Sequence, residues 1–352
     1  MRGDEAAGAG RVLSWTGLRR RGVRVQTQGV MKAIQIHQTG GPEVLTLAEI
    51  PTPTPGDGQV LIQIAATGVN FIEIYVREGR YKAPLPLVPG SECAGTVAAL
   101  GEGLTGLAVG DRVVTVSAVG AYAEYALAPA DKVVKVPDGV TLEQAAAVFL
   151  QGMTAHYLAH STFPLKPGDT ALVHAAAGGV GLLLTQMATA VGARVIATVS
   201  TEPKAKLARE AGAAEVILYT EVDFEAEVKR LTDARGVDVV YDSVGLTTFE
   251  KSLRSLRPRG MMVLFGGSSG AVPPFDLIQL STLGSLYVTR PTLWHYIATR
   301  VELEARANAV LGWVAEGKLK VRMQYTYPLA KAPQAQMDIA SRKTTGKLLL
   351  VP

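Results

Sequence analysis

Cysteine is almost absent from this sequence. The 352 residues include one, Cys93, so no disulfide can form within the chain. Because disulfides are common in secreted proteins and rare in reducing compartments, this count favours a cytoplasmic protein. A single thiol also excludes a zinc site built from four cysteine ligands.

Long apolar runs are lacking, and so is a net charge on the body of the chain. No run of about 18 apolar residues occurs, so we expect no membrane-spanning helix. Of the 35 basic and 31 acidic residues, six arginines and two acids lie in residues 1–30, which leaves 29 of each sign in the remainder. A neutral body offers no basic surface for phosphate contacts, so we expect no nucleic-acid partner.

Residues 1–30 are rich in glycine, alanine and arginine and show no hydrophobic periodicity. We expect a poorly ordered extension, with the folded body beginning at Met31. Two origins stay open, an upstream start codon before a true start at Met31, and an arginine-rich transit peptide. The acids Asp4 and Glu5 and the lack of an extended amphipathic pattern count against a transit peptide.

Strand-like runs dominate residues 31 to about 150. Short alternating or apolar runs recur there, separated by turn residues such as proline and glycine. This tight spacing predicts a small barrel-like antiparallel domain. The runs that carry the pattern are residues 60–65, 95–99, 112–116 and 122–126.

Apolar runs of strand length alternate with segments of helical period from about residue 141. This alternation predicts an α/β fold with a doubly wound parallel sheet. The expected strands are 170–174, 194–198, 215–218, 237–241 and 261–265, and the expected helices lie near 179–191, 202–211, 223–232 and 246–256. Mixed elements follow, with helices near 301–315 and 331–340 and a closing strand at 347–351. We therefore assign residues 153–289 to a Rossmann domain, and residues 31–152 with 290–352 to the β-rich domain.

A glycine-rich turn joins the first of these strands to the first helix. On the template G-x-G-x-x-G, Ala176 stands for the first glycine, and Gly178 and Gly181 match the other two. Gly178 lets the backbone approach a pyrophosphate, and Gly181 lets helix and strand pack closely. The free N–H groups at the start of the helix favour phosphate binding. The strand and helix on either side favour a dinucleotide site over a purely structural glycine turn.

The end of the next strand predicts NADPH rather than NADH. NAD sites usually place an acid there for the ribose 2′-hydroxyl. Here Thr198 and Ser200 are neutral, and Lys204 follows, which suits a 2′-phosphate. Glu202 argues against this choice but fits the first turn of a helix.

The order of a β-rich part, an α/β part and a return to the first resembles the medium-chain dehydrogenase/reductase superfamily, whose β-rich part is a GroES-like catalytic domain. Many members bind zinc, but the segment that matches their Gly-His-Glu ligand motif reads Gly90-Ser91-Glu92 here, so we expect no metal. His156 and His160, four apart on a predicted helix, lack a third ligand. Several stretches are more similar to the zinc-free quinone oxidoreductases, the zeta-crystallin-like branch. These stretches are residues 68–75, 149–155, 174–181, 241–245, 265–270 and 284–291.

This resemblance implies a zinc-independent NADPH:quinone oxidoreductase that acts as a homodimer, with the dimer contact near residues 262–290. It places Asn70, Glu73, Tyr75 and Tyr81 in the catalytic cleft, where hydrogen-bond donors polarise the acceptor. Gln151 and Arg290 are further candidates at the domain junction. The cofactor-binding residues that we expect are Thr154, Gly178, Gly179, Val180, Gly181, Ser200, Lys204, Tyr219, Val244, Gly266 and Ser268.

Two other functions stay open at this point. A zinc-free enoyl or alkenal reductase shares the fold and the cofactor, and the sequence barely separates it from a quinone reductase. A protein that chiefly binds NADPH or RNA is the more distant alternative, and the neutral body gives no support for RNA binding.

Overall fold

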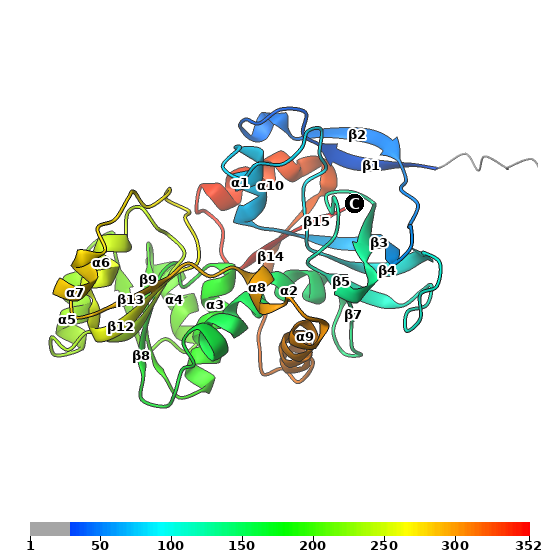
Figure 1. Ribbon diagram of the computed structural model, residues 1–352. Coiled ribbons are helices and arrows are strands. Elements are labelled where there is room, and N and C mark those ends of the chain that lie inside the picture. Colours follow the sequence, from blue (N-terminus) through cyan, green and yellow to red (C-terminus); the bar gives the residue numbers. More distant parts are fainter. Residues whose placement is uncertain (1–28) are drawn as a thin grey trace, which may run out of the picture.

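The computed structural model describes residues 29–352, which form two lobes with a helical layer between them (Figure 1). Residues 1–28, and with them nearly all of the expected extension, lie outside the described residues. None of the described helices combines the length and the apolarity that a membrane crossing needs.

The first lobe, which we call the α/β lobe, holds a six-stranded parallel sheet in the order β10-β9-β8-β11-β12-β13. The strand order reverses between β8 and β11, which makes the carboxyl ends of these strands a ligand site in folds of this kind. The strands are β8 (Thr170–Val173), β9 (Arg194–Val199), β10 (Glu215–Leu218), β11 (Val237–Asp242), β12 (Leu256–Leu264) and β13 (Tyr287–Thr289). The helices are α3 (Gly179–Ala190), α4 (Glu202–Glu210), α5 (Phe224–Leu231), α6 (Phe249–Arg254) and α7 (Ile278–Thr282).

The second lobe, the β lobe, holds a seven-stranded sheet in the order β14-β15-β3-β4-β5-β7, with β6 paired to β3. Every pair is antiparallel except β14 with β15. Its strands are β3 (Gln59–Val69), β4 (Cys93–Leu100), β5 (Arg112–Thr115), β6 (Tyr125–Pro129), β7 (Val133–Lys135), β14 (Met323–Pro328) and β15 (Lys347–Val351), and β1 (Val30–Gln35) and β2 (Thr46–Pro51) form a separate pair. Its helices are α1 (Phe71–Arg77), α8 (Leu293–Tyr296), α9 (Arg300–Ala315) and α10 (Ala332–Ala340).

The predicted α/β fold with a GroES-like part is confirmed, and the expected strands and helices of the α/β lobe are present with small shifts at their ends. The strand expected at 122–126 is wrong at its start, because β6 begins at Tyr125. The backbone of residues 122–124 instead pairs with β1, with Ile34 N donating to Tyr122 O at 2.8 Å and Glu124 N to Lys32 O at 3.0 Å. A hydrophobic pattern indicates an extended segment but does not show which strand it pairs with.

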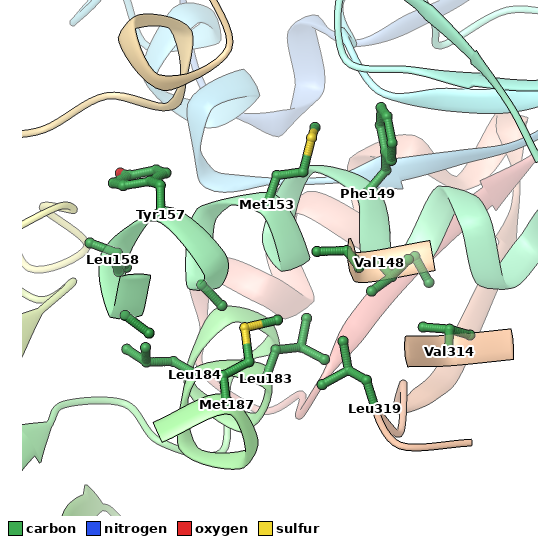
Figure 2. Close-up of a cluster of buried hydrophobic side chains, with 14 of the residues drawn as sticks. Val148, Phe149, Met153, Tyr157, Leu158, Leu183, Leu184, Met187, Val314 and Leu319 are labelled. Atoms are coloured by element: carbon green, nitrogen blue, oxygen red, sulfur yellow. The ribbon is translucent and has the colours of Figure 1, made fainter. Parts of the chain in front are cut away.

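Helix α2 (Leu142–Tyr157) joins the two lobes (Figure 2). It begins at a capping box in which Thr141 and Gln144 bond each other's backbone N–H. The helix is apolar nearly all round, as a helix buried on every side should be. Phe149 and Met153 of α2 share one buried cluster with Leu184 of α3, and this cluster reaches both sheets. The domain boundary expected at residues 152–153 falls inside this helix.

Candidate active site

A cavity of about 690 Å³ lies between the lobes and is lined by residues of both. This volume is within the range of about 300–1,000 Å³ that is typical of small-molecule and cofactor sites. The lining includes every site residue predicted from the sequence except Glu73. These residues are Asn70, Tyr75, Tyr81, Thr154, Gly178, Gly179, Val180, Gly181, Ser200, Lys204, Tyr219, Val244, Gly266 and Ser268, together with Gln151 and Arg290.

The lining of this cavity is positively charged. Lys204, Lys251, Arg290 and Arg342 contribute to it, and none of the described residues in the lining is acidic. A concave site of one charge sign attracts ligands of the opposite sign. The cavity therefore suits an anionic ligand.

The glycine turn between β8 and α3 forms one wall. Ala175 has a φ of +50°, and Gly178 is the N-cap of α3. A Cβ on Gly181 would lie 2.4 Å from the carbonyl oxygen of Ala175, so this position needs glycine for the helix to pack on the turn. The first N–H groups of α3 have no acceptor within the helix, and Gly179, Val180 and Gly181 line the cavity, so the start of this helix suits an anion.

A side chain at Gly179 would also clash, but with a different part of the protein. A Cβ there would lie 1.8 Å from Oε1 of Gln151, a side chain of α2 rather than part of the turn. The turn is thus in contact with the helix that joins the lobes.

Behind the turn, His174 is buried and bonded on both ring nitrogens. Nδ1 lies 2.8 Å from Oγ1 of Thr198 and Nε2 lies 2.9 Å from Oγ of Ser252. Burial lowers the pKa of this histidine, which favours the neutral ring. These contacts with β9 and α6 cannot be read from the local sequence around His174.

Ser200, Lys204 and Arg342 come together in the lining of the cavity. Lys204 Nζ donates to Ser200 Oγ at 3.3 Å and to the carbonyl oxygen of Arg342 at 2.6 Å. Burial and the nearby charge of Arg342 lower the pKa of Lys204. Two cations and a hydroxyl with no acid in the lining form an anion site. Arg342 was missed, since it comes from the β lobe and lies in a loop without a motif.

Aromatic rings of α1 and the segment after it form the opposite wall. The rings of Tyr75 and Tyr81 lie 5.7 Å apart at 81°, and Phe71 lies 6.2 Å from Tyr75. Burial raises the pKa of Tyr75, although a hydrogen bond from the backbone of Gly267 opposes the effect. Tyr75 is 9% exposed and Tyr81 is 46% exposed, so one ring lies inside the cleft and the other at its rim.

The side chain of Asn70 faces a buried polar cluster. Its Oδ1 accepts from Lys347 Nζ at 2.7 Å and from Gln151 Nε2 at 3.3 Å. Its Nδ2 donates to Glu92 Oε2 at 3.0 Å and to Gly68 O at 3.4 Å. Both amide hydrogens of Asn70 are therefore engaged. Tyr75 and Tyr81 are the residues that contribute hydroxyl groups to this wall of the cavity.

Glu73 does not line the cavity. It is 3% exposed and forms a capping box with Asn70 at the start of α1, where its Oε2 accepts from the backbone N–H of Asn70 at 2.9 Å. Burial raises its pKa to about 8, although the charge of Lys347 lowers it. Asn followed three residues later by Glu is the sequence signal of this cap, and it predicts the start of α1.

Across residues 29–352, the candidate metal ligands do not come together in one cluster. No group of three or more His, Cys, Asp or Glu side chains in residues 29–352 is placed to bind a metal ion. Glu92 pairs with Lys347, and Cys93 is buried with a pKa raised by burial to about 12. The ring centroids of His156 and His160 lie 4.6 Å apart, and burial lowers the pKa of His156 to about 4.

Two family models match the chain, the alcohol dehydrogenase GroES-like domain over residues 56–138 and the zinc-binding dehydrogenase model over residues 179–302. Quinone oxidoreductase 1 of Escherichia coli is 46% identical, over 91% of this chain and 99% of the relative. The 2-haloacrylate reductase of a Burkholderia species is 42% identical, over 92% of this chain and 99% of the relative. A mycobacterial structure described as complexed with NADPH is 51% identical with a TM-score of 0.89, covering 92% of this chain and 100% of that one.

Although the second model is named for zinc binding, the residues at this site do not match a zinc site. Ser91 stands in place of the ligand histidine, and Glu92 bonds an ammonium group. The cavity, its glycine turn and the relatives all point to the same family. The chain belongs to the quinone oxidoreductase family, in the zinc-independent branch of the medium-chain dehydrogenase/reductase superfamily.

Proposed function

We propose that this protein reduces quinones with NADPH by hydride transfer, without a metal. The observation that carries the proposal is one continuous cavity that joins the glycine turn, the cation pair of Lys204 and Arg342, and the aromatic wall of Tyr75 and Tyr81. The E. coli relative is named a quinone oxidoreductase, and the mycobacterial relative is described as complexed with NADPH.

The described residues fit this cofactor. Gly181 leaves no room for a side chain at the turn, so the start of α3 stays open to a pyrophosphate. Ser200, Lys204 and Arg342 suit a 2′-phosphate, and Tyr219 beside them lines the cavity. When bound, NADPH supplies the hydride, and the protein holds the acceptor against it.

The side chains on the acceptor side orient the quinone and stabilise the charge that develops on it. Phe71, Tyr75 and Tyr81 give flat apolar surfaces for a planar ring. As the hydride adds to the quinone, negative charge gathers on its oxygen, and we expect the hydroxyls of Tyr75 and Tyr81 to donate to it. A proton then completes the hydroquinone, so that the quinone, NADPH and one proton give hydroquinone and NADP⁺.

Oxidation of NADPH tests this function directly. We expect rapid loss of absorbance at the nicotinamide band with 1,4-benzoquinone or 9,10-phenanthrenequinone, and slow loss with a 2-alkenal. Chelation should change neither rate. An absence of quinone-dependent NADPH oxidation would contradict the proposal.

Tyr75→Phe tests the part played by hydrogen bonding. We expect a modest fall in kcat, because Tyr81 still donates and the net contribution of one neutral hydrogen bond is about 0.5–1.5 kcal/mol, or about two- to tenfold in rate. Binding of NADPH, followed by its fluorescence, should not change. A variant that binds NADPH normally but has no detectable activity would instead identify Tyr75 as an obligatory proton donor.

Reduction of a double bond conjugated to a carbonyl is the second candidate. It is favoured by the 2-haloacrylate reductase, which is 42% identical over nearly its whole length. The same hydride donor and the same hydroxyl groups would serve, since charge again develops on an oxygen. A higher kcat/KM for 2-haloacrylate or a 2-alkenal than for any quinone would favour this candidate.

We also propose a homodimer formed through the free edge of the six-stranded sheet. β13 is the last strand of that sheet, and Tyr287 on it is 59% exposed. Leu277 and Ile278, at the start of α7 in the same lobe, are 73% and 66% exposed. Apolar side chains at an exposed strand edge favour pairing with another chain. The lone, buried thiol of Cys93 fits a reducing compartment such as the cytoplasm.

A further inference from the structure

A lysine and a glutamate are buried together beneath the acceptor side of the cleft. Lys347, the first residue of β15, is 1% exposed, and Glu92, just before β4, is 0% exposed. Lys347 Nζ lies 2.5 Å from Glu92 Oε2, and the backbone N–H of Leu150 donates to Glu92 Oε1 at 2.6 Å. A Cβ on Gly68 would lie 2.0 Å from Glu92 Oε2 and 2.6 Å from Lys347 Nζ, so glycine is needed there to admit the pair.

The stability of the fold is a poor explanation for this pair. Removing two charges from water offsets much of their attraction, and apolar residues of similar size often serve as well. The pair does, however, fix the hydrogen bonding of its neighbours, because an ammonium group can only donate and a carboxylate can only accept.

The two charges determine which way the amide of Asn70 points. The atom of Asn70 that lies 2.7 Å from Lys347 Nζ must be an acceptor, the carbonyl oxygen. The atom that lies 3.0 Å from Glu92 Oε2 must be a donor, the amide nitrogen. A flipped amide would place a donor against the ammonium and an acceptor against the carboxylate.

The orientation of Asn70 in turn determines that of Gln151 on α2. Asn70 Oδ1 is an acceptor, so the atom of Gln151 that lies 3.3 Å from it is the amide nitrogen. The carbonyl oxygen of Gln151 then points the other way, against Gly179 of the glycine turn. This oxygen is buried and has no hydrogen-bond partner among the described residues. One ordered chain of contacts therefore runs from Lys347 to the turn at the start of α3.

We propose that Lys347 is a positioning residue for hydride transfer. Together with Glu92 it orients the side-chain amides of Asn70 and Gln151. These amides fix the position of the quinone-binding wall of the cleft relative to the glycine turn, which binds the cofactor. The proposal rests on the proposed function, because it concerns the geometry of that reaction. Hydride transfer depends steeply on the placement of donor and acceptor, so a change in this chain of contacts should slow the chemical step.

The double variant E92Q/K347M tests the proposal by removing both charges while keeping the side-chain sizes. We expect a folded protein with a near wild-type Tm and NADPH affinity, but a kcat lower by about tenfold or more. The primary isotope effect with NADPH deuterated at C4 should rise, because hydride transfer becomes rate-limiting. The control D238N/R257M neutralises a second ion pair, in which Asp238 is 2% exposed and neither residue lines the cavity, and it should keep the wild-type kcat.

A folded E92Q/K347M protein with wild-type kcat and isotope effect would overturn the proposal. If wild type itself fails to oxidise NADPH with a quinone, the proposed function fails instead. The affinity for NADPH, measured by fluorescence, reports on the cofactor site in either case.

Gln151→Glu gives a second test that does not depend on the folding of the double variant. Its carboxyl can donate to Asn70 Oδ1 only while protonated, so its kcat relative to wild type should fall as the pH rises. Gln151→Leu should show a loss that does not vary with pH. Glu73, Glu92 and Lys347, which all bond Asn70, are the same in all three proteins, so the ratio to wild type at each pH isolates the effect of the substitution. Equal and pH-independent ratios for the two variants would overturn the proposal.

Discussion

Lys204 and Arg342 meet at one end of the cavity although they lie on different lobes. If they bind the 2′-phosphate, Lys204→Ala should raise the KM for NADPH and leave the KM for NADH nearly unchanged. The loss of one charge-assisted hydrogen bond corresponds to about tenfold to hundredfold in KM. Initial rates with both cofactors measure this. Equal loss with both would contradict the assignment, and Lys206→Ala, an exposed lysine on the same helix, should have no effect on either.

Glu73 should make the stability of the fold depend on pH. Its pKa is about 8 in the folded protein against 4.5 for an ordinary glutamate, with burial as the main cause. Between these values the folded state holds a proton that the unfolded state has lost, so stability falls as the pH rises through this range. The slope is about 1.4 kcal/mol per pH unit for one proton.

Glu73→Gln mimics the protonated side chain and should flatten this dependence, giving a higher Tm than wild type near pH 8 and a similar Tm near pH 4.5. Thermal unfolding across that range measures it, and Glu49→Gln, at an exposed position, is the control. A Tm that falls equally with pH in the variant and in wild type would show that other groups are responsible.

The sequence predicts residues of this site when their roles depend on local order. Gly178, Ser200 and Lys204 follow strands in a fixed pattern, so the order of strand, turn and helix in the sequence is enough to predict their positions. Lys347 and Arg342 depend on packing between segments far apart in the chain, since Lys347 bonds Asn70 from 277 positions away. No local pattern marks such a contact.

At the level of elements, the contact between β8 and α3 should tolerate no side chain at Gly181. A Cβ there would meet two backbone atoms, Ala175 O at 2.4 Å and Ala176 Cα at 2.7 Å, which cannot move aside as a side chain could. Gly181→Ala should therefore displace α3, lower the Tm and weaken NADPH binding at least tenfold, as measured by fluorescence titration.

Gly312→Ala on α9 is the matched control, because a Cβ there would meet nothing within 4 Å. Replacing glycine by alanine inside a helix stabilises it by about 0.5–1 kcal/mol. This variant should gain stability and keep its affinity for NADPH. Normal binding by Gly181→Ala would refute the role of the close helix packing.

Helix α1 illustrates why an element can be missed. Residues 71–76 are apolar or aromatic apart from Glu73, and such a run matches a strand as well as a helix. The capping box of Asn70 and Glu73 settles the choice, and α1 then presents Phe71 and Tyr75 to the cavity. The strands β8, β9 and β11 were easier, since each is buried on both faces and followed by a helix.

At the level of the whole molecule, α2 makes one body of the two lobes. Its buried face shares a cluster with residues of both sheets, among them Ala94 and Val173. The cavity wall on α2, from Leu150 to Tyr157, is thus fixed relative to both lobes. The alternation of strands and helices predicts each lobe separately, but it does not show that one helix belongs to both cores.

The proposed dimer places two such molecules edge to edge through β13. The solution mass should then be twice the 37.1 kDa of one chain by light scattering. Charges on an exposed strand edge oppose pairing, so Tyr287→Lys combined with Val288→Lys should give a monomer. Val109→Lys, at a 65% exposed position on the β lobe, should remain dimeric. Because the glycine turn and the pair of Lys204 and Arg342 lie in the same chain, the monomer should still bind NADPH. A wild-type protein that is monomeric at micromolar concentration would contradict the interface, and the function of the cleft would stand without it.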